Sequence, residues 1–291
     1  MANNAKPAGA AATDGFSPPG TSPAVAIAAF GGWNDAGSAA TDTVAFLANA
    51  LGAEKFQLID PEGYCDFQVN RPQVRFDVDG QRRLLWPSTD FMKAELNGQP
   101  IILIGGVEPS FRWGAYCDEI LGMLAACQVE RLIILGALLA DVPHTRPVPV
   151  KLSSLDPATS KALNLEKSTY EGPAGIVTVL EHVAWHNLSL PGLVMWAAVP
   201  HYVASSPSPG AQLALLREVE LQLGTEFDKT DLEDDAATWR EGVDELASED
   251  SEVSEYVSQL ETAKDTLDSP AASGEALAKE FERYLRHRAD E

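Results

Sequence analysis

Five short runs of apolar residues, each followed by a turn or a helical stretch, constrain the fold of this chain more than any other feature. The runs cover residues 24–30, 101–106, 132–137, 175–180 and 192–199. A continuous apolar run of this length is typical of a strand that is buried on both faces of a sheet. A helical repeat, with apolar or alanine positions three or four apart, covers residues 36–51, 112–127 and 180–187. We therefore expect an α/β fold, with a largely parallel sheet and helices on both of its faces.

Changes in composition divide the chain into three regions. Residues 1–22 are rich in Ala, Gly and Pro and lack the apolar core of a signal peptide, so we expect a disordered leader. Residues 23–224 hold the predicted sheet, with an insertion at 61–99 that is typical of a hairpin turning at Asp79 and Gly80. Residues 225–291 carry 21 acidic and 7 basic residues, which is −14 of the formal net charge of −22, and they repeat apolar residues at helical spacing. This pattern predicts a small, acidic, helical C-terminal region.

Charge and cysteine usage exclude several classes of function. A net charge of −22 disfavours nucleic acid and anionic membranes as partners, because both are bound by clustered Lys and Arg. No apolar run approaches the roughly 18 residues that a membrane span requires. The three cysteines form no Cys-x-x-Cys pair, which argues against a disulfide framework or a zinc site of the Cys-rich type. We expect a cytoplasmic protein that binds neither nucleic acid nor a membrane.

The stretch "FGGWNDAGSAA" at residues 30–40 looks at first like a phosphate-binding loop. Residues 32–38 have the glycine spacing of a P-loop, but Ser38 stands where the lysine should be and Ala39 where the magnesium ligand should be. Asp35 would repel a phosphate at this position, whereas it could cap the helix that follows. We interpret the stretch as a strand-to-helix turn in which Asn34 or Asp35 caps the helix and Trp33 projects from the rim.

Polar residues follow several of the predicted strands. Loops at the carboxyl ends of parallel strands converge at one edge of an open sheet, and ligands commonly bind there. The candidate binding edge comprises Gly31, Gly32, Trp33, Asn34, Asp35, Glu108, Asp141, His144, Arg146 and His201.

The residues of this edge do not form a recognisable catalytic set. An enzyme could use His144 or His201 as a general base, Asp141 or Glu108 to orient it, and Arg146 to hold an anion. The sequence has no Gly-x-Ser-x-Gly nucleophile motif, and its cysteines have no adjacent basic residue that would activate a thiol. His182 and His186 have the spacing of a metal pair on a helix, but no third ligand can be identified. We assign no catalytic residue, no metal site and no cofactor.

Several loops together resemble one known family. The matching stretches are "FGGWNDAGSAA", "GGVEPSFRW", "GALLADVPHTRPVPV", "GIVTVL", "WAAVPHYVA" and "ALAKEFERYLRHR". In their order and spacing they resemble the PAC2 (proteasome assembly chaperone 2) family over residues 24–288, and its actinobacterial branch most closely. The resemblance implies a three-layer α/β/α sandwich of the phosphorylase/hydrolase-like type with a small C-terminal helical appendage.

The resemblance also implies a function, although a shared fold does not transfer an active site. Eukaryotic and archaeal relatives bind proteasome α-subunits without catalysis, and a homo-oligomer such as a trimer is expected. Those relatives dock through a C-terminal tail with a hydrophobic residue followed by Tyr, whereas this sequence ends "RHRADE".

Three hypotheses of function follow. The leading one is a non-enzymatic, protein-binding protein, with proteasome subunits or other proteins as partners. The alternative is a small-molecule-binding enzyme or sensor that uses Asp35, Glu108, His144, Arg146 and His201 at the sheet edge. A scaffold that acts through its acidic helical tail is ranked last, because runs of charge usually face solvent.

Overall fold

The computed structural model describes residues 23–268, which form two compact units. Within the described residues, the first unit comprises 23–35, 40–136 and 151–196, and the second comprises 36–39, 137–150 and 197–268. The predicted leader at 1–22 and the apolar positions Leu277, Phe281 and Leu285 of the predicted C-terminal repeat lie outside the described residues.

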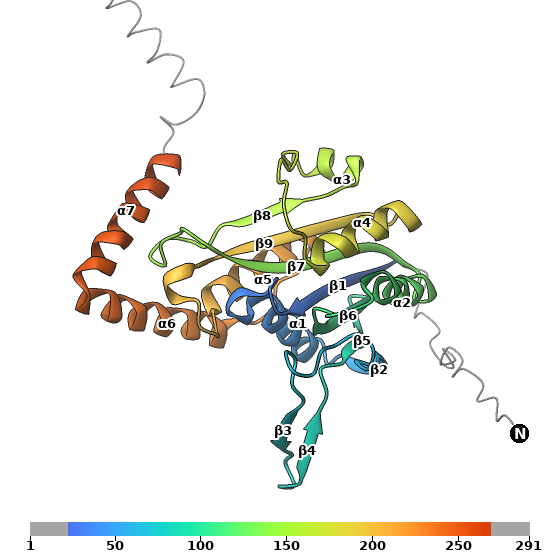
Figure 1. Cartoon of the computed structure of the whole chain (residues 1–291). Coiled ribbons are helices and arrows are strands. Elements are labelled where there is room, and N and C mark those ends of the chain that lie inside the picture. The colour runs from blue at the N-terminus through green and yellow to red at the C-terminus, as the bar shows by residue number, and fades with distance from the viewer. Residues whose placement is uncertain (1–22, 269–291) are drawn as a thin grey trace, which may run out of the picture. The chain divides into compact units, whose positions relative to one another are not determined.

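The central sheet has seven strands in the order β2-β5-β6-β1-β7-β9-β8 (Figure 1). Their bounds are Glu54–Ile59, Thr89–Leu96, Gln99–Val107, Ala24–Gly31, Val129–Ala140, Gly192–Pro200 and Val150–Ser153, in that order. The strands predicted at 24–30, 101–106, 132–137 and 192–199 are confirmed as β1, β6, β7 and β9.

The sheet is mixed, and this corrects the expectation of a largely parallel one. Strand β1 is parallel to both β6 and β7, whereas β5 is antiparallel to both β2 and β6. The turn between β5 and β6 consists of Asn97 and Gly98, which have φ values of 52° and 81°. Two residues with positive φ close a tight hairpin, and this geometry forces the two strands to run antiparallel.

The prediction of a strand at 175–180 is wrong. These residues begin helix α4 (Ile176–Leu188), with Gly175 as its N-cap. The side chains of Ile176, Leu180 and Ala184 are buried at a spacing of four residues. A six-residue apolar run fits a buried strand and a buried helix face equally well, and only the continuation of the repeat to Ala184 distinguishes them.

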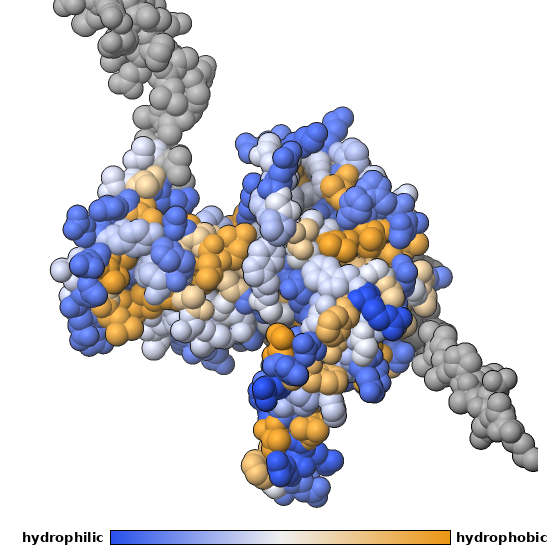
Figure 2. Space-filling view, viewed as in Figure 1, coloured by the Kyte–Doolittle hydropathy of each residue, from blue (hydrophilic) through white to orange (hydrophobic). Residues whose placement is uncertain are grey.

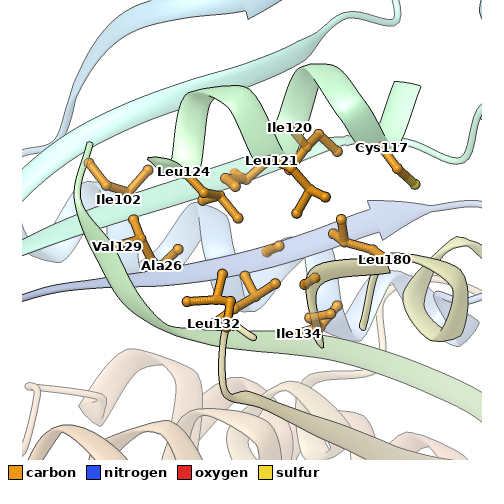
Figure 3. Close-up of a cluster of buried hydrophobic side chains, with 14 of the residues drawn as sticks. Ala26, Ile102, Cys117, Ile120, Leu121, Leu124, Val129, Leu132, Ile134 and Leu180 are labelled. Carbon is orange, nitrogen blue, oxygen red and sulfur yellow. The ribbon is translucent and has the colours of Figure 1, made fainter. Parts of the chain in front are cut away.

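Helices cover both faces of the sheet, so the expected three-layer α/β/α sandwich is confirmed. Helices α2 (Trp113–Ala126) and α4 pack over one face, where Ile120, Leu124 and Leu180 meet Ile102 and Leu132 (Figure 3).

Helix α1 (Ala39–Ala50) lies over the opposite face. Its Val44 side chain stands 3.7 Å from where a Cβ on Gly105 would lie, and Gly105 pairs with Ala29 of β1. Because side chains alternate along a strand, Ala29 faces away from the cluster that contains Ala28 and Phe30. The first unit also contains a short helix, α3 (Pro157–Ala162).

A two-stranded ribbon extends away from the central sheet (Figure 1). It consists of β3 (Gln73–Phe76) and β4 (Arg82–Leu85), which pair antiparallel. Its turn is closed by a hydrogen bond of 2.9 Å from Asp77 N to Gln81 O, and Gly80 takes a φ of 73° in it. The predicted hairpin around Asp79 and Gly80 is therefore present as a separate small sheet.

The second unit is mainly helical. It contains the 3-10 turns η1 (Ala36–Ser38) and η2 (His201–Val203) and the helices α5 (Pro209–Leu223), α6 (Thr230–Glu249) and α7 (Ser251–Asp268). Helix α5 packs against α6, and α6 packs against α7. Leu232, Val243 and Val257 are buried, as the helical repeat predicts, but Leu246 of the same repeat is 65% exposed. Within residues 23–268, no helix combines the length and the hydrophobicity needed to cross a membrane.

Candidate functional site

The glycine-rich turn at 31–35 connects β1 to the helix that follows it. Gly32 has a φ of 119°, which only glycine adopts without strain. Asp35 N donates a hydrogen bond of 3.1 Å to Gly32 O, and Glu108 N donates one of 2.8 Å to Gly31 O. The Trp33 side chain is 66% exposed. The turn therefore holds a large aromatic ring in solvent above a tightly bonded backbone.

Asp35 occupies the N-terminus of helix α1. Its carboxylate accepts a hydrogen bond of 2.7 Å from Ala40 N and another from the Thr41 hydroxyl. Burial raises the pKa of Asp35, and the hydrogen bonds from Thr41 and Ala40 oppose that rise. The carboxylate takes the place that a phosphate would need at this helix end. The geometry thus agrees with the capping interpretation of the sequence. The Asp35 carboxylate would block a phosphate from binding at this helix end as it does in a P-loop.

Asn34 and Glu108 meet beside the start of helix α4. Asn34 is fully buried, and its Nδ2 donates a hydrogen bond of 2.7 Å to Glu108 Oε1. The same carboxylate oxygen accepts a bond of 2.9 Å from Ile176 N. Glu108 thereby satisfies one of the free N–H groups in the first turn of α4, where a negative charge is also favoured by the helix dipole.

Gly175 completes this cluster, and sequence reasoning missed it. A Cβ on Gly175 would lie 1.9 Å from Asn34 Oδ1, so no larger residue fits. Asn34 Oδ1 is buried and has no hydrogen-bond partner among the described residues. The signal in the sequence was a glycine directly before an apolar run, which is an N-cap pattern once that run is recognised as a helix.

His144 lies in a second group of polar residues, within the second unit. Its Nδ1 is 2.7 Å from Tyr202 Oη and its Nε2 is 2.9 Å from Asp244 Oδ1. Tyr202 Oη also accepts a hydrogen bond of 2.8 Å from His144 N. All three contacts are satisfied when the tyrosine hydroxyl donates to Nδ1 and the hydrogen on Nε2 is donated to Asp244. The imidazole therefore links the loop before β8 to helix α6.

Arg146 and His201 make similar links to helix α7. Arg146 donates from Nε and Nη2 to the two carboxylate oxygens of Asp265, at 2.8 Å each, and from Nη1 to Glu261 at 3.1 Å. His201 Nδ1 lies 3.1 Å from Asp141 Oδ1, which also accepts a hydrogen bond of 3.2 Å from Tyr256. A two-bond arginine–carboxylate pair fixes orientation as well as attracting charge.

In the second unit, four of the sequence-predicted site residues have partners within the chain. Asp141, His144, Arg146 and His201 all contact helix α6, helix α7 or each other. The six residues from Gly31 to Asp35 and Glu108 belong to the first unit, and these four belong to the second. That all ten residues share one crevice stays a prediction. Sequence reasoning missed the partners Tyr202, Asp244, Tyr256, Glu261 and Asp265.

The remaining candidates lie elsewhere. The rings of His182 and His186 are neighbours on α4, with centroids 4.3 Å apart, but no group of three or more possible metal ligands occurs within residues 23–268. Cys117 and Cys127 are buried free thiols, and burial raises the pKa of each to about 11. A thiol with so high a pKa is a poor nucleophile at neutral pH.

Comparison with known proteins finds one family. The sequence matches the PAC2 family over residues 29–247. A PAC2 family protein from Streptomyces avermitilis is 45% identical, with a TM-score of 0.74, and the match covers 80% of this chain and 99% of that one. A proteasome-assembly chaperone homologue from Mycobacterium tuberculosis is 44% identical, with a TM-score of 0.72 and the same coverage.

A more distant structure shares the fold alone. It is the archaeal proteasome activator PbaB of Pyrococcus furiosus, which is 14% identical with a TM-score of 0.62, and the match covers 77% of this chain and 93% of that one. No curated protein matches the chain.

Proposed function

This chain belongs to the PAC2 family, and we propose that it acts by binding other proteins rather than by catalysing a reaction. A 44% identical relative is a proteasome-assembly chaperone homologue, which supports proteasome subunits as partners of this chain. We choose the α-subunits because the family resemblance implies them. The chain also associates with itself as a homo-oligomer. The observation that carries this proposal is the surface of the β3–β4 ribbon.

The ribbon surface, residues 69–86, exposes several large apolar side chains among charged ones, and Figure 2 shows orange areas beside blue ones on this element. Phe76 is 72% exposed and Val78 is fully exposed. The exposed large apolar side chains of this surface are Val69, Val74, Phe76, Val78, Leu84, Leu85 and Trp86. Concentrated exposed apolar area of this kind marks an interaction surface, since it gains free energy when a partner covers it.

The ribbon also needs a partner for its own stability. A two-stranded hairpin is marginally stable by itself in water, and both outer edges of β3 and β4 are unpaired in the described chain. A protein that packs on the apolar side chains, or adds a strand to an edge, would stabilise it.

Charge narrows the partner to an acidic protein surface. The ribbon surface carries four arginines and two aspartates, so it is basic in a chain whose net charge is −22. Arg83 pairs with Asp77 at 2.9 Å, and Arg75 and Arg82 are exposed. A second copy of this chain, with its many carboxylates, meets this requirement, which supports self-association.

The site geometry supports a binding role over an enzymatic one. Glu108 and Asp35 bond to helix N-termini, and His144, Arg146 and His201 bond to carboxylates or to Tyr202. A side chain that already holds a structural hydrogen bond is less available for proton transfer or anion binding. The alternative of a small-molecule enzyme or sensor at the sheet edge stays a prediction, and a stoichiometric metabolite retained in native mass spectrometry would favour it.

Sedimentation velocity with purified components tests the proposal. The chain is run alone and then with the host's proteasome α-subunits, in the wild type and in a Phe76→Ser/Val78→Ser variant. The matched control is Leu221→Ser, which removes a 72% exposed apolar side chain of α5. We expect oligomers and a complex for the wild type and the control, and their loss in the ribbon variant. A wild-type chain that stays monomeric and does not bind the α-subunits would overturn the proposal.

A further inference from the structure

The second unit contains a cavity of about 350 Å³, and His144 and Arg146 of the predicted binding edge are among the residues that line it. It lies among the loop at 144–150, the first half of helix α5 and the middle of helix α6. Its volume is at the lower end of the range for small-molecule sites, which runs from about 300 to 1,000 Å³. The wall on α5 follows one helix face, with Leu213 and Ala214 one turn before Arg217.

We propose that this cavity binds a small organic monoanion, a carboxylate attached to a short apolar body. The apolar part would contact Leu213, Ala214 and Trp239, which supply aliphatic and aromatic surface. The carboxylate would meet Arg217 from α5 and Arg240 from α6. Guanidinium groups bind carboxylates with two parallel hydrogen bonds, which makes arginine the side chain best suited to this ligand class.

The two arginines are available to a ligand. Arg240 is exposed, and its guanidinium forms no ion pair or hydrogen bond with any residue in the range 23–268. Arg217 pairs with Glu233 at 2.9 Å, but the side chains are 57% and 45% exposed, and such a surface pair contributes little free energy. Arg146 also lines the cavity, and it is already bonded to Asp265 and Glu261.

Glu218 limits the charge of the ligand. It lines the same cavity as Arg217 and Arg240, and Glu233 already pairs with Arg217, so the carboxylates nearby offset much of the positive charge. A monoanion therefore suits the cavity better than a phosphate ester or a dicarboxylate, which would be repelled more strongly by Glu218 and by the acidic chain.

Ser208 offers a further polar group. It lines the cavity as the N-cap of helix α5, and its side chain makes no capping hydrogen bond. Its hydroxyl can therefore donate a hydrogen bond to a ligand oxygen. Together with the guanidinium of Arg240, it gives the cavity polar groups that a ligand can use. This inference is independent of the β3–β4 ribbon.

Calorimetric titration with phenylacetate tests the proposal, with phenylacetamide as the neutral probe of the same shape. We expect phenylacetate to bind with one site per chain and phenylacetamide to bind at least about tenfold more weakly, which corresponds to the loss of one charge-assisted hydrogen bond. Hexanoate should bind as phenylacetate does, because the cavity selects the charge and the apolar body. Failure of both carboxylates to bind would overturn the proposal.

Three variants locate the binding. Arg217→Gln/Arg240→Gln should weaken phenylacetate binding by at least about tenfold per arginine. Ala214→Trp should abolish it by filling the cavity without changing any charge, so it remains informative if the double variant unfolds. Lys161→Gln removes an exposed positive charge of helix α3, which does not line the cavity, and should bind like the wild type. Undiminished binding in both cavity variants would place the carboxylate elsewhere and refute the site.

Discussion

Asn34 and Glu108 are 74 residues apart in the sequence, and Asn34 Nδ2 donates a hydrogen bond of 2.7 Å to Glu108 Oε1. This bond connects the turn after β1 to the turn after β6, two neighbouring parallel strands. Because Glu108 also accepts a hydrogen bond from Ile176 N, the pair anchors helix α4 to both turns. A buried polar network of this kind stabilises the fold only while every carboxylate bond is kept.

Replacing Asn34 should destabilise the protein. Asn34→Ala removes a buried hydrogen bond to Glu108, and we expect the free energy of unfolding to fall by about 1–3 kcal/mol. Guanidinium chloride unfolding measures this change. The control is Asn49→Ala, at an exposed position of α1, which should alter stability by less than about 0.5 kcal/mol. Equal effects of the two substitutions would contradict a structural role for the Asn34–Glu108 bond.

Gly175 should tolerate no side chain. Gly175→Ala would place its Cβ 1.9 Å from Asn34 Oδ1, and the displacement should cost about 1–3 kcal/mol of stability. Gly122→Ala in helix α2 is the matched control, because its Cβ meets nothing within 4 Å. That control should gain up to about 1 kcal/mol from helix propensity. Thermal unfolding followed by circular dichroism compares them, and a Gly175→Ala protein as stable as the wild type would disprove the close contact.

Glu181 should make stability depend on pH. It is only 7% exposed, and burial raises its pKa to about 7 despite a hydrogen bond from Leu155 N. The folded state therefore favours the protonated acid, so stability is full below pH 4.5 and is lost as the pH rises towards 7. The loss should approach about 3 kcal/mol, at about 1.4 kcal/mol per pH unit between the two pKa values.

Glu181→Gln tests this pH dependence, since the amide is neutral at every pH. Its free energy of unfolding should match the wild type near pH 4 and exceed it near pH 8. Glu130→Gln, at an exposed position of β7, is the matched control. Denaturant unfolding at the two pH values measures the difference, and an advantage of Glu181→Gln that does not grow with pH would count against a protonated Glu181.

Arg146 should hold helix α7 in place. Its guanidinium bonds to Asp265 and Glu261, and the hydrogen bond to Asp265 is the main reason that the pKa of Asp265 lies below its usual value. In Arg146→Ala we expect faster amide hydrogen exchange along residues 251–268 and unchanged exchange in helix α2. Salt at about 0.5 M should also increase the exchange rate in wild-type α7, because it screens partly exposed ion pairs. Lys161→Ala is the control for the loss of one positive charge. If the exchange rate in α7 is the same in Arg146→Ala as in the wild type, the anchoring role is contradicted.

Local sequence patterns were sufficient to predict the structure where residues interact mainly with their neighbours in sequence. The Asp79–Gly80 turn and the cap at Asp35 depend on a few adjacent residues, and both lie where the sequence predicted them. The strand predicted at 175–180 is the clearest failure. A short apolar run does not by itself specify a helix or a strand, and the packing around these residues makes them the start of helix α4.

Sequence alone determined four of the apolar strands and the helices between them, and with them an α/β fold with helices on both faces of a sheet, because the spacing of apolar residues follows directly from residue order. It also indicated which polar residues follow the strands. Only the tertiary structure decided their partners, since Asn34 with Glu108 and His144 with Asp244 are pairs separated by 74 and 100 residues. It likewise decided that Arg217 and Arg240 line one cavity, because the packing of α5 on α6, and no local pattern, brings them together.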